Sequence, residues 1–237
     1  MLLPLRLDNL NAVPFAPHKD ANTCRLHSGL LQLAPGTCVV VDETVLGAGT
    51  LNAQGISNMR ALASVAGSSS LPYSFPFYET AWPVDTPVLV IATGARPLTP
   101  VDIPVFLQPG SSGSKLVQPA AVVALRAFLV ASRAAPFALS PAGAERIQEA
   151  WMDARRAGVA RAEAAAASGA AKPALVTDAD LHRWISLARL AAISHGESDV
   201  SAERLATVLE LERMRSARNT RHATAQGGGT ASTPRKQ

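Results

Sequence analysis

Two short runs of consecutive apolar residues most strongly limit the folds open to this chain of 237 residues. The first run is CVVV at 38–41, and the second is VLVIA at 88–92. Strands that are apolar at every position are typical of parallel sheets covered on both faces. Residues 52–65 predict a helix after the first run, and a hairpin is predicted at 71–85, so strand, helix, hairpin and strand follow one another along the chain. This order predicts an α/β layer. Further apolar runs, bounded by Gly, Pro and Ser, predict strands at 30–33, 73–79 and 103–108.

The second half of the chain has the periodicity of helices. Apolar residues at helical spacing predict helices at 120–135, 140–156, from 177 onward, and from about 201 to 218. Two of these have start signals. Ser140 precedes a proline, and Thr177 precedes Asp180 by three residues in a capping-box arrangement. The alanine-rich stretch 158–174 is interpreted as a variable linker, although it could also extend the second helix.

Charge is concentrated at the C-terminal end. Residues 213–237 contain six basic residues and no acid, which leaves −2 for the rest of a chain whose net charge is +4. The last part of this segment is too poor in apolar residues to pack, which predicts a disordered basic tail. We favour a solvated or localisation-type tail over a DNA-binding surface. No apolar run is long enough for a membrane span. With only two cysteines, the chain fits a reducing compartment.

Asp42 and Glu43, directly after the first apolar run, form the sharpest local pattern. A buried strand that ends in Asp-Glu resembles a Walker B motif, in which the Asp holds the Mg²⁺ shell and the Glu polarises a water. The matching phosphate loop, G-x-x-x-x-G-K-[ST], is absent from the sequence. The nearest similar stretch, residues 110–115, follows the carboxylates and has the wrong spacing. Asp42 and Glu43 are therefore interpreted as a Walker-B-like remnant with a structural role.

The remaining polar residues form no recognisable catalytic set. Four residues, Cys24, His27, Cys38 and His18, lack the spacing of a zinc site, and Cys38 is expected to be a packed thiol in its strand. Trp151 and Trp184 stand at helical spacing among aliphatic residues, which indicates core positions. The sequence therefore predicts no catalytic residue, no cofactor and no metal.

Several of these stretches together resemble one known family. The central stretch reads RLHSGLLQLAPGTCVVVDET at 25–44, and LNAQG follows at 51–55. Shorter matching stretches are PHKD at 17–20, YSF at 73–75, PVLVI at 87–91, Asn58, and Ala61 with Leu62. From about residue 9 to 218, the chain resembles the C-terminal half of the minichromosome maintenance (MCM) complex-binding proteins. That family is similar in turn to the AAA+ module of the MCM helicase. Residues 125–133 and 151–155 resemble the first two helices of the helicase lid, and 181–189 with the fourth helix resemble its last pair.

The chain departs from an active helicase at two places. Residues 93–97 read TGARP where an ATPase carries a polar sensor, and residues 100–104 read PVDIP where the helicase carries an arginine finger. Arginine fingers alone contribute about 10³ to 10⁵ in rate. The resemblance therefore implies a degenerate AAA+-like module that does not hydrolyse nucleotide.

The resemblance also implies what this module does. The expected protein is a nuclear, non-catalytic partner of MCM helicase subunits in DNA replication. It would regulate the assembly, stability or unloading of the complex from chromatin, with links to the cell cycle and sister chromatid cohesion. DNA would be contacted only through the MCM complex, and neither a small-molecule substrate nor a membrane is expected.

The expected architecture has four parts. Residues 1–109 are predicted to form a partial AAA+-like three-layer α/β domain, 110–118 a linker, 119–218 a helical lid-like domain, and 219–237 a disordered tail. Compared with the family, the chain begins near the middle, so we expect the first strands of the α/β layer to be missing. Two alternatives remain open. One is a fragment of an AAA+ ATPase whose phosphate-binding loop is missing from this chain. The other is a DNA-binding accessory that acts through the basic tail.

Overall fold

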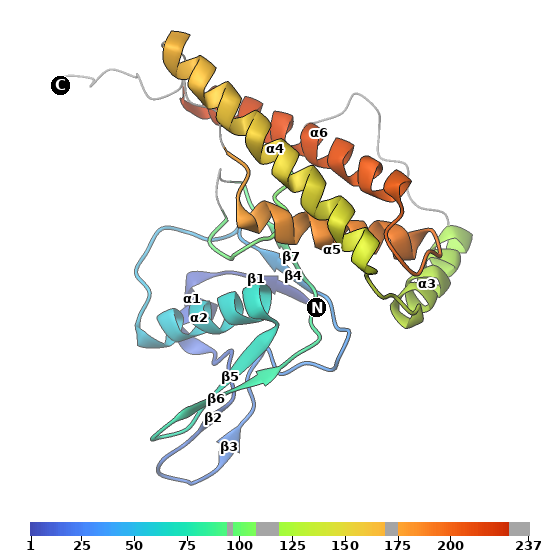
Figure 1. The fold of residues 1–237 in the computed structure, drawn as a ribbon. Helices are drawn as coiled ribbons and strands as arrows, with labels where there is room; N and C mark the ends of the chain where they lie inside the picture. Colours follow the sequence, from blue (N-terminus) through green and yellow to red (C-terminus); the bar gives the residue numbers. More distant parts are fainter. Residues whose placement is uncertain (94–96, 108–118, 169–174, 228–237) are drawn as a thin grey trace, which may run out of the picture. The chain divides into compact units, whose positions relative to one another are not determined.

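The computed structural model describes residues 1–93, 97–107, 119–168 and 175–227, with side chains described as far as residue 220. The chain divides into two compact units, Met1–Pro104 and Val105–Gln237. The described residues form six helices and two small sheets, which confirms the predicted mixed α/β class (Figure 1). The predicted linker 110–118 lies outside the described residues, so the predicted domain boundaries stay predictions.

A three-stranded parallel sheet forms the centre of the first unit. Its strands are β1 (Leu2–Pro4), β4 (Val39–Asp42) and β7 (Val88–Ile91), in the order β1-β4-β7. Strands β4 and β7 confirm the two apolar runs as parallel neighbours. Strand β1, which the sequence analysis did not predict, pairs with β4 from Leu2 opposite Val40 to Pro4 opposite Asp42.

The prediction that both faces of these strands are covered is wrong for β7. Val88 and Val90 pack against the core, whereas Leu89 and Ile91 are 55% and 46% exposed. In β4, Val39 and Val41 are fully buried. Only one face of this sheet therefore packs into the core of the unit, and an unbroken apolar run did not require a second layer.

A second sheet has the strand order β3-β2-β5-β6. It consists of β2 (His18–Lys19), β3 (Leu26–His27), β5 (Ser70–Ser74) and β6 (Glu79–Pro83). Strands β5 and β6 form the hairpin predicted at 71–85. The stretch 73–79, predicted to contain a strand, includes the end of β5, the turn and the first residue of β6. The amide of Phe75 closes this turn by donating to the carbonyl oxygen of Tyr78 at 2.9 Å. The strands predicted at 30–33 and 103–108 do not form among the described residues. At 30–33 the backbone instead forms hydrogen bonds locally and to residues 14 and 15.

Two helices pack in the first unit. Helix α1 (Leu7–Ala12) contacts α2 (Ala53–Ser68), and α2 packs against β5. Asn52 is the N-cap of α2 and accepts a hydrogen bond from the amide of Gly55, which fixes the predicted helix start. The buried core joins both helices to the parallel sheet through Leu3, Leu5, Leu10, Phe15, Leu31, Val39, Val41, Ala61, Leu62, Val65 and Leu71.

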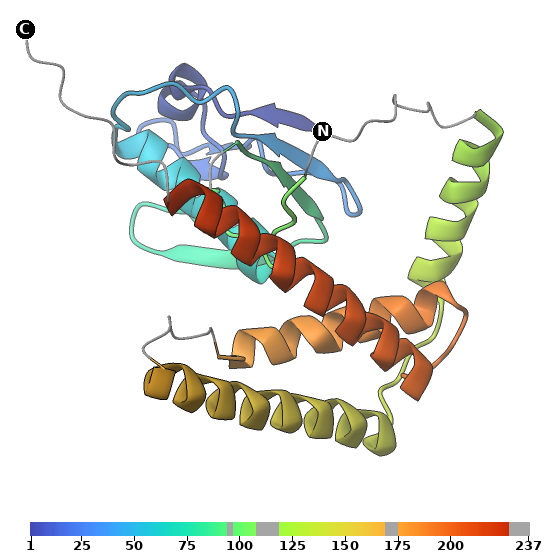
Figure 2. The same ribbon diagram turned by 90° about the horizontal axis from the view of Figure 1, so that it is seen from above.

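The second unit is helical, as predicted. Its helices are α3 (Pro119–Ala134), α4 (Pro141–Ser168), α5 (Asp178–Ser194) and α6 (Ala202–Gly227). Helix α5 packs against both α4 and α6 (Figure 2). Their shared core consists of Ile147, Ala188, Val200 and Leu205. No described helix is long and apolar enough to cross a membrane.

Two helices are longer than predicted. Helix α4 continues twelve residues past Arg156 to Ser168, because alanine has the highest helix propensity and the stretch 158–168 contains no proline. Helix α6 continues to Gly227, so residues 219–227 of the predicted disordered tail are helical. The rest of that tail, 228–237, lies outside the described residues.

Candidate functional site

Strand β4 brings Asp42 and Glu43 to the carboxyl edge of the parallel sheet, where a Walker B pair would lie. The backbone of Asp42 holds the edge together, because its carbonyl oxygen accepts from the amide of Leu5 at 2.9 Å. Its side chain accepts hydrogen bonds from Thr44, two residues further along the chain. Oδ1 accepts from the amide of Thr44 at 3.0 Å and from the Thr44 hydroxyl at 2.6 Å. This arrangement is an Asx turn, which ends the strand.

The carboxylate of Glu43 binds a loop that is distant in sequence. Oε2 accepts from the amide of Leu98 at 2.9 Å, and Oε1 accepts from the amide of Thr99 at 2.8 Å. Thr99 is buried, with 1% of its surface exposed. Glu43 therefore holds the segment that follows β7 in place through both of its carboxylate oxygens. Both oxygens of the residue that would polarise water in an ATPase are occupied by the backbone of the same unit.

The described residues offer no ligand set around this pair. Among them, no group of three or more His, Cys, Asp or Glu side chains could hold a metal ion. His18 and His27 do lie together, with their rings stacked 5.4 Å apart across β2 and β3. Cys38 lies outside that pair. Its side chain is exposed, so the prediction of a packed thiol is wrong, because β4 begins one residue later.

The residues around 51–58 form a polar junction between α1 and α2. Asn52 donates two hydrogen bonds to Asn11: its backbone amide donates to Asn11 Oδ1, and its side-chain Nδ2 donates to the Asn11 carbonyl oxygen, each at 3.0 Å. A Cβ on Gly55 would lie 2.5 Å from Asn11 Oδ1. The absence of a side chain at Gly55 therefore leaves room for the Asn11 side chain in its hydrogen bond to Asn52.

Asn58 is the most buried polar side chain of this junction, with 1% of its surface exposed. Its Oδ1 accepts from the amide of Phe15 at 2.8 Å. Its Nδ2 donates to the carbonyl oxygens of Leu10 and Val13 at 2.8 and 2.7 Å. One amide therefore satisfies three backbone groups where α1 ends and the chain turns. Asn52, Gly55 and Asn58, which belong to the stretches quoted for the family resemblance, thus join α2 to α1 and to the residues after it.

Gly29, in the SGLLQL stretch, also has a structural role. A Cβ at this position would lie 2.3 Å from the carbonyl oxygen of Phe15. The close approach lets the amides of Leu30 and Leu31 donate to the carbonyl oxygens of Pro14 and Phe15, at 3.0 and 2.9 Å. Leu31 is thereby held in the core.

An exposed aromatic group lies at the tip of the β5–β6 hairpin. Phe77 is 97% exposed and Tyr78 is 61% exposed. The rings of Phe75 and Tyr78 stack 4.7 Å apart, and Trp82, 55% exposed, lies 5.8 Å from the ring of Tyr73. Aromatic side chains in water are characteristic of protein contact sites, where they are enriched among the residues that dominate binding energy. The sequence predicts the hairpin but does not indicate this aromatic cluster.

Helix α3 exposes a second apolar group. Its predicted apolar face includes Leu125 and Leu129, which are 51% and 58% exposed. Val123 and Val130 are 67% and 70% exposed on the same helix. In Figure 2, α3 extends away from the other three helices. Its periodicity predicted the helix correctly, although this face is not buried among the described residues.

The second unit contains a buried ion-pair network that the sequence analysis missed. The guanidinium of Arg183 donates to Asp180, a capping residue of α5, and to Glu212 of α6 at 2.8 Å. Arg215 donates to both oxygens of Glu212, at 2.7 and 2.9 Å. Desolvation alone would raise the pKa of Glu212. The hydrogen bonds from the two arginines outweigh it and hold the pKa below its ordinary value. This network joins the start of α5 to α6.

Local capping in this unit matches the prediction. Thr177 and Asp180 form the capping box at the start of α5. The hydroxyl oxygen of Ser140 accepts from the amide of Gly143 at 3.0 Å, as an N-cap does, and this hydroxyl donates to Asp199 at 2.6 Å. The first basic residues of the segment 213–237 are also paired with acids. Arg213 pairs with Glu210 at 2.7 Å, and Arg215 pairs with Glu212.

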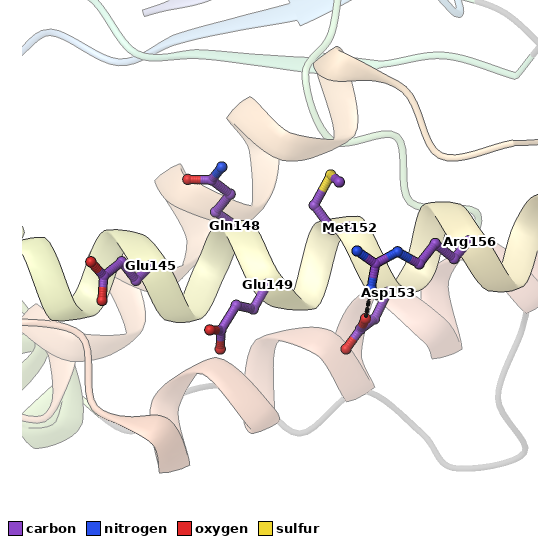
Figure 3. A pocket seen from close by; sticks show the side chains of 6 residues that line it. All are labelled: Glu145, Gln148, Glu149, Met152, Asp153 and Arg156. Carbon is purple, nitrogen blue, oxygen red and sulfur yellow. Dashed lines mark hydrogen bonds and ion pairs between the residues drawn. The ribbon is translucent and has the colours of Figure 1, made fainter.

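A shallow pocket follows the exposed face of α4. All of its lining residues come from this one helix: Glu145, Gln148, Glu149, Met152, Asp153 and Arg156 (Figure 3). Arg156 pairs with Asp153 at 3.2 Å, and both side chains are more than 70% exposed. The pocket lacks the convergent, desolvated groups of an active site. It is interpreted as a solvated helix face.

The described residues thus define a mixed α/β protein with a helical second unit. Its polar clusters hold chain segments together, and some of its large apolar side chains are exposed on the β5–β6 hairpin and on α3. The chain belongs to the family described as Mini-chromosome maintenance replisome factor, whose family model matches residues 1–219.

Curated relatives agree with this assignment. The chain is 32% identical over 225 residues to the Mini-chromosome maintenance complex-binding protein of Drosophila melanogaster, which covers 89% of this chain and 34% of the relative. It is 30% identical over 217 residues to the protein of that name from Arabidopsis thaliana, and the match covers 91% of this chain and 34% of the relative. For the Homo sapiens protein of that name the identity is 28% over 226 residues, and the match covers 91% of this chain and 33% of the relative. The chain therefore spans about a third of the length of these relatives.

Proposed function

We propose that this chain is a non-catalytic binding partner of the MCM helicase complex. Its relatives are named for binding this complex. The observation that carries the proposal is the aromatic tip of the β5–β6 hairpin, where Phe77 is 97% exposed beside Tyr78 and Phe75. A fold that places three neighbouring aromatic residues at a hairpin tip has a surface suited to protein contacts.

The geometry around Asp42 and Glu43 supports a role without nucleotide hydrolysis. In an ATPase these carboxylates would face the metal and the attacking water. Here Asp42 is engaged by Thr44, and Glu43 is engaged by the amides of Leu98 and Thr99. We therefore interpret the first unit as a degenerate AAA+-like core and the helical second unit as its lid-like partner. The parallel order β1-β4-β7, with two acids at the edge of its central strand, supports this interpretation.

A subunit-like module without catalytic parts can act by occupying a subunit interface. When a ring is built from head-to-tail contacts, a look-alike bound at one contact blocks closure at that point. The protein would then regulate the assembly, stability or unloading of the helicase during DNA replication. For this role the protein would act in the nucleus and contact DNA only through the helicase.

The test is co-purification of the tagged full chain with purified MCM subunits. We expect recovery of at least one subunit, and we expect Phe77→Ser to reduce that recovery. The matched control is Ile56→Ser, which changes a 46% exposed apolar residue on α2 of the same unit. Retention of MCM subunits by the control and their loss by the hairpin variant would support the proposal. Failure of the unmodified chain to recover any subunit would refute it.

A further inference from the structure

Strand β6 is an edge strand of the four-stranded sheet, since the order is β3-β2-β5-β6. Edge strands expose unpaired backbone groups, and proteins normally protect them with prolines, charges or a covering element. In β6 the protection lies only at the two ends, with Glu79 at the start and Pro83 at the end. The three residues between them, Thr80 to Trp82, include neither a proline nor a charged residue.

The register identifies which backbone groups face outward. The turn bond from Phe75 to Tyr78 and the bond from the amide of Val84 to the carbonyl oxygen of Ser69 flank the hairpin. Because hydrogen-bonded pairs alternate in an antiparallel ladder, the registered pairs that bond across the hairpin are those of Thr80 and Trp82. The amides and carbonyls of Glu79 and Ala81 therefore point away from β5.

Hydrogen bonds on the other edge of β5 agree with this alternation of inward and outward backbone groups. Ser74, the partner of Glu79, donates its amide outward to the carbonyl oxygen of Pro17 at 3.0 Å. The partner of Ala81 is Pro72, which has no amide hydrogen to donate. Glu79 and Ala81 thus hold the same outward position on β6 as Ser74 and Pro72 hold on β5. Both residues are exposed, and no described residue bonds to their backbone groups.

The chemistry next to this edge indicates the type of occupant. Tyr78 and Phe77 lie at the tip, immediately before the edge groups, and can contact apolar side chains of a neighbouring strand. Glu79 is the one charged residue between Ser70 and Pro83. A segment that pairs with β6 would therefore combine apolar side chains with a basic residue near Glu79. The small side chain of Ala81 leaves the centre of the edge open to such a strand.

We propose that the outer edge of β6 is the docking site for an extended segment of an MCM subunit, which adds beside β6 as a further strand. This mode is β-strand addition, in which main-chain hydrogen bonds give affinity and neighbouring side chains give specificity. The inference rests on the proposed function, because it names the partner through that function and specifies how the partner is held.

Ala81→Pro is the variant that tests the edge. It removes an outward amide hydrogen and places a ring against the incoming strand, while the bonds of Thr80 and Trp82 to β5 remain. The matched control is Ala81→Ser, which keeps the amide. With purified MCM subunits, we expect affinity to fall by about tenfold or more for the proline variant, which corresponds to about 1.4 kcal/mol. The serine variant is expected to bind within about twofold of the unmodified chain.

Hydrogen exchange of the unmodified full chain provides a second measurement that does not depend on the folding of a variant. We expect the amides of Glu79 and Ala81 to gain protection when MCM subunits are added, and not in the chain alone at any concentration. Concentration-dependent protection in the chain alone would overturn the inference, because a second copy would then occupy the edge. Binding without protection, and with equal affinity for both Ala81 variants, would overturn the edge inference and leave the proposed function intact. No binding of the unmodified chain would overturn both.

Discussion

Replacing Asn58 by alanine should strongly destabilise the first unit. The side chain satisfies three backbone groups, the amide of Phe15 and the carbonyl oxygens of Leu10 and Val13, at 2.7 to 2.8 Å. Each buried group left without a partner costs about 1–3 kcal/mol. Two of the three groups are fully buried, so the expected loss is at least about 2 kcal/mol. The total stability of a typical domain is about 5–15 kcal/mol.

Unfolding of the full chain in urea, followed by hydrogen exchange, measures this loss where it arises. We expect early exchange of the amides in α1 and of Phe15 in Asn58→Ala. The matched control is Ser57→Ala, which changes the exposed neighbour on α2 and should alter stability by less than about 0.5 kcal/mol. If Asn58→Ala unfolds within about 1 kcal/mol of the unmodified chain and Phe15 stays protected, the structural role assigned to this residue is wrong.

Three further predictions follow from single contacts. Gly29→Ala should lower the free energy of unfolding by about 2–3 kcal/mol, measured in urea, because its Cβ would lie 2.3 Å from the carbonyl oxygen of Phe15; unchanged stability would contradict that close approach. Glu43→Ala should cost about 1 kcal/mol by releasing the amides of Leu98 and Thr99, without changing recovery of MCM subunits; loss of recovery in a folded variant would show that Glu43 has a role in binding. Glu212→Gln should cost about 2 kcal/mol at neutral pH, because it weakens charge-assisted hydrogen bonds from Arg183 and Arg215. Because the folded pKa of Glu212 is lowered, its ion pairs contribute above the ordinary value of 4.5, and the difference from the unmodified chain should shrink as pH falls below it; a difference that grows toward acid would refute this direction.

Features that depend on neighbouring residues were predictable from the sequence. The capping box of Thr177 and Asp180 and the N-cap of Ser140 involve groups within three positions of each other. Strand β4 was predictable because its apolar run ends at two acids. Strand β1 was not, because it is only three residues long and contains a proline. Its partner β4 is far along the chain, so no local pattern indicates the pairing.

The candidate site was only partly predictable for the same reason. The position of Asp42 and Glu43 at a strand end was visible in the sequence. The partners of Glu43 are separated from it by 55 and 56 residues, so its role as an anchor required the fold. The network of Arg183 and Glu212 spans two helices and was missed. In the alanine-rich stretch, both a linker and a helix were open, and helix propensity prevailed as far as Ser168.

The most direct test of the central proposal is the equilibrium affinity of the full chain for purified MCM subunits, measured with and without ATP. We predict saturable binding that does not depend on ATP and that Asp42→Asn leaves unchanged, because Asp42 is bonded to Thr44 within its own turn. Absence of binding, or binding that requires ATP bound to this chain and is lost in Asp42→Asn, would contradict a non-catalytic partner of the helicase.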